Sequence, residues 1–191
     1  SSSSGCLNNL RQMMIGWMTY KDNNGDVLVP NSPAGSGSAN WCSGSSGDWA
    51  VAPANTNRAT YLNALLAPYL ANRIELYHCP ADTISSFNGQ RIRSYSMNGQ
   101  VGAVYNLSNY NYGWRQYVKG GDLICPIPKD AFVFADENMC SLQDGYLQVS
   151  CTSPRYPECP ANYHEGAGSF SFADGHAALH RWTPGYSLIS A

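Results

Sequence analysis

The sequence predicts an α+β fold, in which an N-terminal helix packs on an antiparallel β-sheet with long irregular loops and a C-terminal β-hairpin. Three features carry this prediction: an apolar stripe of helical period near the start of the chain, short buried-looking runs in its middle, and an Asp174-Gly175 turn between two alternating runs near its end. With 191 residues, the chain is long enough for one domain with a core of its own.

The predicted N-terminal helix covers residues 6 to about 21. Its apolar side chains recur every three or four residues and so form one stripe that can pack on a sheet: Leu7, Leu10, Met14, Trp17 and Met18. Asn23-Asn24-Gly25 ends the helix, because these residues accept a left-handed backbone. Residues 1–5 are interpreted as a cloning remnant or a natural flexible N-terminus, and residues 6–191 as a single globular domain.

The middle of the chain contains a second predicted helix and three predicted strands. The helix covers residues 56–72, with Thr56 or Asn57 as its cap. Pro68 lies inside this pattern and is expected to kink or shorten the helix at the preceding residue. The alternating or apolar runs typical of strands are residues 93–98, 131–135 and 146–150.

A β-hairpin is predicted over residues 169–182. Phe170 and Phe172 alternate with small residues, which is the pattern of a half-buried strand. Asp174-Gly175 then favours a tight type I′ turn, because this dipeptide tolerates positive φ angles. A second alternating run continues after the turn through Ala178, His180 and Trp182.

Composition argues against several classes of partner. Charged residues make up only 13% of the chain and the net charge is −2, so no basic face for nucleic acid or anionic lipid is expected. The seven cysteines include no Cys-x-x-Cys pair, which favours disulfides in an oxidising compartment over a zinc ribbon. Cys151 and Cys159 are the first candidates for a bridge, with Cys140 as an alternative partner for either, and Cys6 is the candidate for the unpaired thiol.

Motifs in the same order along the chain resemble one protein family. His164, nine further residues and Asp174-Gly175 resemble the H-x9-D-G motif of bacterial type II secretion-like pseudopilins. Four earlier blocks and the helix start resemble the family as well, so the resemblance extends from residue 6 to residue 182: Cys6–Gln12, Tyr20–Gly25 with Pro30, His78–Asp82, Arg93–Asn98 and Phe134–Glu137. The family's basic leader, its cleavage site and its apolar membrane-spanning segment are not in this sequence.

The resemblance implies a pilin-like domain that is the soluble head of a structural subunit, not an enzyme. Such subunits belong to a type II secretion-like pseudopilus or pilus-like filament at the bacterial cell surface. They are anchored in the inner membrane before assembly and then lie in the periplasm or outside the cell. Their partners are other pseudopilin subunits, contacted through the N-terminal segment missing here, and a secreted substrate or glycan. We expect this head to be monomeric or weakly associated.

A calcium site is the first candidate for metal binding. Asp136, Glu137, Asn138 and Asp144 lie close together in sequence, and Ca²⁺ takes oxygen ligands of these types. Calcium also orders a C-terminal loop in the major pseudopilins, although that motif does not map cleanly onto these residues. The alternative is that Asp136 and Glu137 cap a turn by bonding to backbone amides.

The histidines suggest a second, zinc-dependent reading. His164, His176 and His180 with Glu165 could supply nitrogen and oxygen ligands to zinc, as in a metal-dependent hydrolase. The competing and favoured reading is that these histidines are structural, with His164 bonded to backbone near the hairpin. The sequence contains no Gly-x-Ser-x-Gly elbow, P-loop or dinucleotide fingerprint.

Loop aromatics define the competing function, a secreted carbohydrate-binding module. Trp41 and Trp49 flank Cys42 in a long Gly- and Ser-rich loop region, and tyrosines follow in residues 105–117. Their rings could stack on a sugar. The alternative is that the two tryptophans cover a small satellite core.

Overall fold

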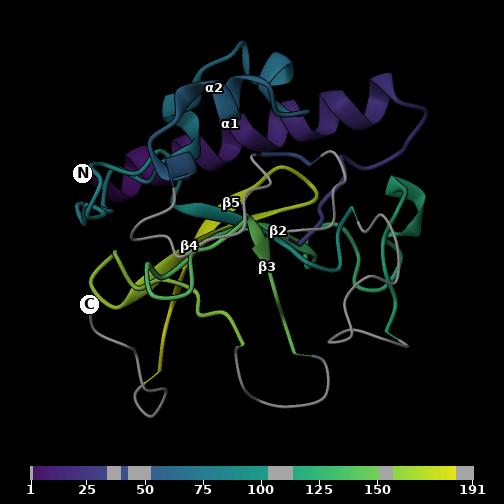
Figure 1. The fold of residues 1–191 in the computed structure, drawn as a ribbon. Helices are drawn as coiled ribbons and strands as arrows, with labels where there is room; N and C mark the ends of the chain where they lie inside the picture. The colour runs from purple at the N-terminus through teal and green to yellow at the C-terminus, as the bar shows by residue number, and fades with distance from the viewer. Residues whose placement is uncertain (1, 34–39, 43–52, 103–113, 151–156, 184–191) are drawn as a thin grey trace.

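The computed structural model describes residues 2–33, 40–42, 53–102, 114–150 and 157–183. Helix α1 spans Ser2–Asn23 and lies across one face of a β-sheet (Figure 1). The helix therefore starts four residues earlier than predicted, and Ser2–Gly5 is helical where a flexible segment was expected. The predicted stripe is confirmed, because the centre of the helix is buried against the rest of the fold: Cys6, Leu10, Met13, Met14 and Trp17.

The sheet has five strands in the order β3-β1-β2-β4-β5. The strands are β1 (Tyr95–Asn98), β2 (Phe132–Asp136), β3 (Tyr146–Leu147), β4 (Ala167–Phe172) and β5 (Ala177–Arg181). Neighbours are antiparallel except for β1 and β3, which run parallel. The α+β class is confirmed. The prediction of a purely antiparallel sheet was wrong at the edge where β3 runs parallel to β1. The third predicted strand is also shorter than expected, with only two paired residues.

The predicted helix over residues 56–72 is broken into short pieces. Helix α2 covers only Arg58–Leu62, and its cap is the predicted Asn57, whose side chain accepts from the amide of Ala59. The amides of Leu65 and Leu66 then donate to the carbonyls of residues 40 and 41, so they leave the helical ladder. The remaining short helices are 3-10 turns: η1 (Pro53–Asn55), η2 (Ala67–Leu70), η3 (Ile74–Tyr77) and η4 (Gly120–Asp122).

The C-terminal hairpin is confirmed, but its turn differs from the predicted type I′. The amide of Gly175 donates to the carbonyl of Phe172 at 2.8 Å, and the amide of Phe172 donates to the carbonyl of His176 at 2.9 Å. Only Gly175 has a positive φ, of 96°, whereas type I′ needs two. The connection is a three-residue loop with a glycine bulge, and a Cβ at Gly175 would lie 3.1 Å from Cε of Met18.

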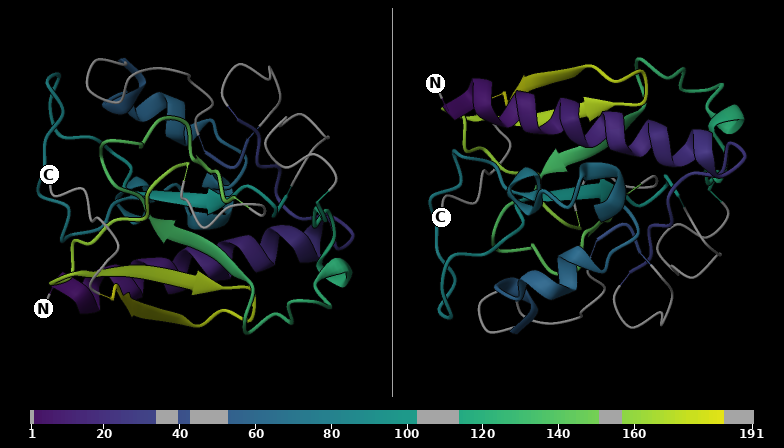
Figure 2. Two further views of the ribbon diagram at one scale, coloured as in Figure 1. Left: turned by 90° about the horizontal axis from the view of Figure 1, so that it is seen from below. Right: turned by 90° about the horizontal axis from the view of Figure 1, so that it is seen from above.

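The hairpin of β4 and β5 lies beside α1, as the views from below and above show (Figure 2). Ser169 and Ser171 are fully buried, whereas Phe170 and Phe172 on the opposite face of β4 are only partly buried. The half-buried strand is therefore confirmed, and its buried face is the one that carries the small residues. Small side chains let the bulky stripe of α1 approach the sheet closely, so the core fills from the helix side.

Candidate functional site

His164 is a buried group that joins the start of α1 to the sheet. Its Nδ1 lies 3.1 Å from Oγ of Ser3, its Nε2 lies 3.1 Å from Oδ2 of Asp136, and the same Nε2 lies 3.5 Å from Sγ of Cys79. The side chains of His164 and Asp136 are almost completely buried. One imidazole therefore contacts the helix, strand β2 and the segment before β1.

A disulfide joins Cys6 of α1 to Cys79, beside this histidine. The expectation that Cys6 carries the unpaired thiol is therefore wrong. Among the described residues, Cys125, Cys140 and Cys159 are free thiols. The predicted partner of Cys159, Cys151, lies outside the described residues, so a Cys151–Cys159 bridge is not among the bonds seen here.

Asp136 is held by donors from strand β4. Its Oδ2 accepts from the amide of Ser169 at 3.0 Å and from the Ser169 hydroxyl. Its Oδ1 has no hydrogen-bond partner among the described residues. A buried carboxylate thus faces the imidazole with one oxygen saturated and the other without a donor.

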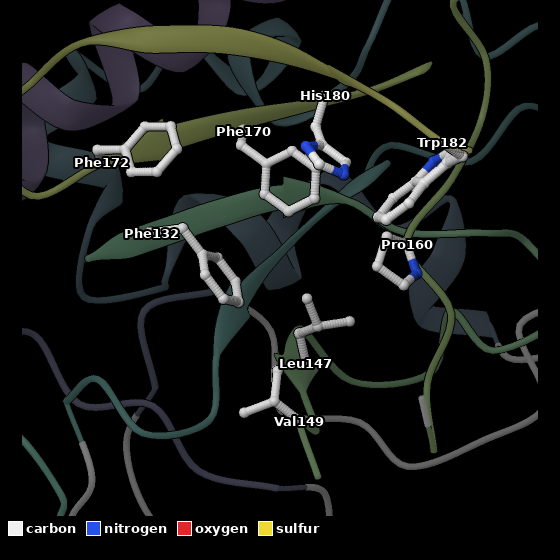
Figure 3. A pocket seen from close by; sticks show the side chains of 8 residues that line it. All are labelled: Phe132, Leu147, Val149, Pro160, Phe170, Phe172, His180 and Trp182. Atoms are coloured by element: carbon white, nitrogen blue, oxygen red, sulfur yellow. The ribbon is translucent and has the colours of Figure 1, made fainter. Parts of the chain in front are cut away.

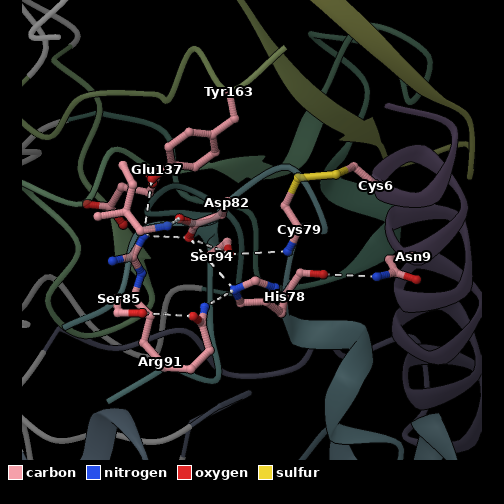
Figure 4. Close-up of polar contacts among 12 residues, drawn as sticks. Cys6, Asn9, His78, Cys79, Asp82, Ser85, Arg91, Ser94, Glu137 and Tyr163 are labelled. Atoms are coloured by element: carbon pink, nitrogen blue, oxygen red, sulfur yellow. Dashed lines mark hydrogen bonds and ion pairs between the residues drawn. A yellow bond between two sulfur atoms is a disulfide. The ribbon is translucent and has the colours of Figure 1, made fainter. Parts of the chain in front are cut away.

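The segment that carries Cys79 is fixed by a second buried polar network (Figure 4). The amide of Cys79 donates to Oγ of Ser94 at 3.1 Å, and the Ser94 hydroxyl donates to Asp82 at 2.8 Å. Asp82 also pairs with the buried guanidinium of Arg91. On the other side, the amide group of Asn9 on α1 donates to the backbone carbonyl of His78 at 2.9 Å. The disulfide is therefore set between a rigid loop and the helix.

The four predicted calcium ligands do not converge. Asp136 faces α1 and His164, whereas the next residue, Glu137, points to the opposite face of the sheet and accepts from the Ser96 hydroxyl. Strand alternation separates two adjacent carboxylates in this way. Asn138 accepts from the amide of Cys140, and Asp144 accepts from the amide of Tyr146. Each of the last two bonds to nearby backbone, whereas the alternative interpretation had assigned such bonds to Asp136 and Glu137.

Glu137 instead belongs to a buried acidic group around Arg93. Burial raises the pKa of Glu137 well above its usual value, and the nearby charge of Glu158 adds to this effect, while Arg93 and the Ser96 hydroxyl lower it. Burial likewise raises the pKa of Glu158 to about 7. Both carboxyls therefore favour the protonated form more than exposed glutamates do.

The histidines do not assemble into a hydrolase site. His164 precedes β4, whereas His176 follows the turn at the strand's other end, and the six-residue strand between them spans about 20 Å. His176 stacks on Phe172 and bonds to Asp174 at 2.6 Å. Glu165 is exposed and has a positive φ. The zinc reading built on His164, His176 and Glu165 is therefore wrong.

Trp41 is not available to a glycan. Its side chain is fully buried in the main core, stacked near Tyr77 and Phe134, and its Nε1 donates to the carbonyl of Gly145 at 3.1 Å. Trp49 and residues 105–113 lie outside the described residues. The predicted glycan contact is therefore wrong for Trp41, which lies in the main core and not in a small satellite core.

The sequence analysis missed an aromatic groove on the face of the sheet that points away from α1 (Figure 3). Its volume is about 230 Å³. It is lined by side chains from four strands and their flanks: Phe132, Leu147, Val149, Pro160, Phe170, Phe172, His180 and Trp182. The alternation of Phe170 and Phe172 was the available signal, but it was used only to predict a half-buried strand.

A search against models of protein families, curated proteins and solved structures finds no match for this chain. Within the described part of the chain, none of the helices combines the length and the apolar character that crossing a lipid bilayer requires.

Proposed function

We propose that this chain is the head of a structural subunit of a type II secretion-like pseudopilus or pilus-like filament. The observation that carries the proposal is that the two ends of the H-x9-D-G motif contact the two ends of the same helix. His164 contacts Ser3 near the start of α1, and Gly175 lies beside Met18 near its end. A motif that fixes a helix to a sheet is expected in a protein whose function requires that helix to keep one position.

The spacing within the motif fits this role. From Ser3 to Met18 an α-helix rises about 22 Å. Strand β4, which occupies most of the nine residues between His164 and Asp174, extends about 20 Å. The strand therefore matches the length of helix that it supports, and nine intervening residues place one contact at each end.

A clamped helix suits a filament subunit for a mechanical reason. In such a filament the N-terminal helices pack in the centre and the heads pack around them, so each head must keep one orientation relative to its helix. The disulfide at Cys6, the contact of His164 with Ser3 and the bond from Asn9 provide three fixed points along α1. The proposed function is accordingly structural, with other copies of the subunit as partners.

The test is localisation of the full-length gene product in its source bacterium. Antibody against this head is expected to detect the protein in filaments sheared from the cell surface. A matched strain without the peptidase that cleaves prepilin leaders is expected to retain the protein in the inner membrane. Protein that is soluble in the cytoplasm, or that is never found in the sheared fraction of either strain, contradicts the proposal.

The carbohydrate-binding alternative has less support. Its first aromatic, Trp41, is buried, and the groove around Phe170 and Trp182 offers few polar groups for sugar hydroxyls. A glycan array separates the two functions, because specific binding that is lost in Trp182→Ala would favour the binding module over a purely structural head.

A further inference from the structure

We propose that this chain has a redox-controlled zinc site, in which Cys6, Cys79 and His164 bind Zn²⁺ when the disulfide between the two cysteines is reduced. Sγ of each cysteine and Nε2 of the histidine all lie within 4.8 Å of one another. The three residues are buried, and they come from α1, the segment before β1 and the segment before β4. This site is independent of the proposed filament function.

The distances suit tetrahedral coordination. Zinc binds thiolate sulfur at about 2.3 Å and imidazole nitrogen at about 2.0 Å, so the sulfur and nitrogen of one tetrahedron lie about 3.5 Å apart. Sγ of Cys79 is 3.5 Å from Nε2 of His164. Once the covalent bond is broken, the two sulfurs can separate to the sulfur–sulfur distance of a tetrahedral site, about 3.8 Å.

The surroundings of His164 suit the site. Metal binding through Nε2 requires the proton on Nδ1, and Oγ of Ser3, 3.1 Å from Nδ1, can accept it. Asp136 Oδ2 lies 3.1 Å from Nε2, and its Oδ1 is buried without a hydrogen-bond partner among the described residues. Asp136 is not among the three residues whose ligand atoms cluster within 4.8 Å, so it borders the site beside His164 and is not counted as a ligand.

The exchange between the two states balances chemically. A dithiol or phosphine reductant supplies two electrons, and with two protons the Cys6–Cys79 bond becomes two thiols. Zinc then replaces both thiol protons, and the two thiolates neutralise the charge of the dication in a buried site. Because both sulfurs are fully buried in the folded protein, the ion enters as the reduced chain folds. A small disulfide oxidant takes up the two electrons and two protons and becomes two thiols, which returns the Cys6–Cys79 bond and releases the ion.

The experiment uses the full chain, unfolded and reduced with a water-soluble phosphine, which becomes the phosphine oxide by taking oxygen from water. The protein is then refolded without air in the presence of Co²⁺, a spectroscopic substitute for zinc. We expect one bound Co²⁺ per chain, with the visible bands of tetrahedral cobalt and a thiolate charge-transfer band in the ultraviolet. Addition of Zn²⁺ is expected to abolish both signals.

Matched variants identify the ligands. The double variant Cys6→Ser/Cys79→Ser keeps the other thiols and is expected to lose the charge-transfer band. Asp136→Asn is expected to bind the metal about 10–100-fold more weakly. His180→Asn changes an exposed histidine and is expected to bind as the parent chain does. A cobalt–thiolate signal that persists in the double cysteine variant overturns the proposal.

A second measurement does not depend on whether the variants fold. Reduced parent protein is refolded with and without Zn²⁺ in the presence of an alkylating reagent, which competes with the metal for the thiols before they are buried, and modified cysteines are located by mass spectrometry. Zinc is expected to protect Cys6 and Cys79 while leaving the exposed Cys125 reactive. Equal modification of Cys6 and Cys79 with and without zinc, or failure of the reduced chain to refold with the metal, overturns the proposal.

Discussion

The two faces of the sheet differ in the size of their side chains and in what covers them. The face under α1 carries small side chains such as Ser169 and is sealed by the helix, whereas the opposite face carries Phe170 and Phe172, which line an open groove. Each face also contains a buried carboxylate, Asp136 under the helix and Glu137 on the other side. The same strands therefore support a rigid contact on one face and an accessible aromatic surface on the other.

The difference teaches that large apolar residues do not by themselves mark the core face of a strand. Helix α1 fills the space above the sheet with large side chains, namely Leu10, Met13, Met14 and Trp17. The strand beneath it therefore needs small side chains on that face if the helix is to pack closely. Phenylalanines on the outer face contact one another and a few neighbouring rings, and they remain partly exposed. Mutations on the two faces of the sheet are therefore expected to lower the free energy of unfolding by unequal amounts.

The largest expected inequality is between Trp17 and Phe172. Trp17→Ala removes a fully buried side chain and is expected to lower the free energy of unfolding by roughly 3–5 kcal/mol. Phe172→Ala removes a partly buried one and is expected to cost only about 1 kcal/mol. Denaturant titrations of both variants check this. Equal losses would show that the two faces contribute equally.

The disulfide is the next strongest contribution to the helix face. Its cysteines are 73 residues apart, and closing a loop of that length in the unfolded chain is worth about 4 kcal/mol. Cys79→Ser is expected to lower stability by about this amount in the metal-free protein, measured by denaturant titration. Cys125→Ser, at an exposed free thiol, is the control and is expected to leave stability unchanged. A loss for Cys125→Ser as large as that for Cys79→Ser would contradict the assignment.

The two buried carboxylates are expected to respond differently to neutralisation. Asp136→Asn takes charge from a carboxylate that accepts from Ser169 and faces His164, and it is expected to cost about 1–3 kcal/mol. Glu137→Gln is expected to cost less than Asp136→Asn at neutral pH, because burial raises the pKa of Glu137 and so favours its protonated, neutral form. Thermal melts of the two variants decide, and a larger loss for Glu137→Gln would refute the distinction.

The outer face is also expected to make stability depend on pH. Burial raises the pKa of Glu158 from 4.5 to about 7, so the folded state holds this proton more tightly than the unfolded state. The stabilisation of the folded state by this proton is complete below pH 4.5 and is lost as pH rises through about 7. Its size is about 1–2 kcal/mol, because Glu158 is partly exposed to solvent. Melts between pH 4.5 and 8 are expected to show this loss in the parent protein and a smaller one in Glu158→Gln.

The sequence predicted those parts of the fold that have a local signal. The period of Leu10, Met14 and Trp17 identifies α1, and Asp174-Gly175 identifies the hairpin, because helical spacing and turn chemistry are properties of neighbouring residues. The choice of face on β4 has no such signal, since alternation is the same whichever side is covered. The break after α2 depends on bonds from Leu65 and Leu66 to a distant loop, which no local pattern contains.

The site was predictable only in part for the same reason. His164 was identified through its motif, but its contact with Cys79 spans 85 residues and Cys6 pairs across 73. Cysteine spacing favoured nearby partners such as Cys151 and Cys159, because sequence proximity was the only criterion available. Asp136 and Glu137 were grouped because they are adjacent, although adjacent residues on a strand face opposite sides.

The central claim is that α1 lies on the small-residue face of the hairpin, and one measurement tests it most directly. In protein labelled at its methionine methyl groups, the Cε methyl of Met18 is expected to show a nuclear Overhauser effect to the α-protons of Gly175, since a Cβ at Gly175 would lie 3.1 Å from that methyl carbon. Observation of this contact supports the helix clamped along the hairpin. Its absence, together with contacts from Met18 to the side chains of Phe170 or Phe172, would place the helix on the opposite face and contradict the account.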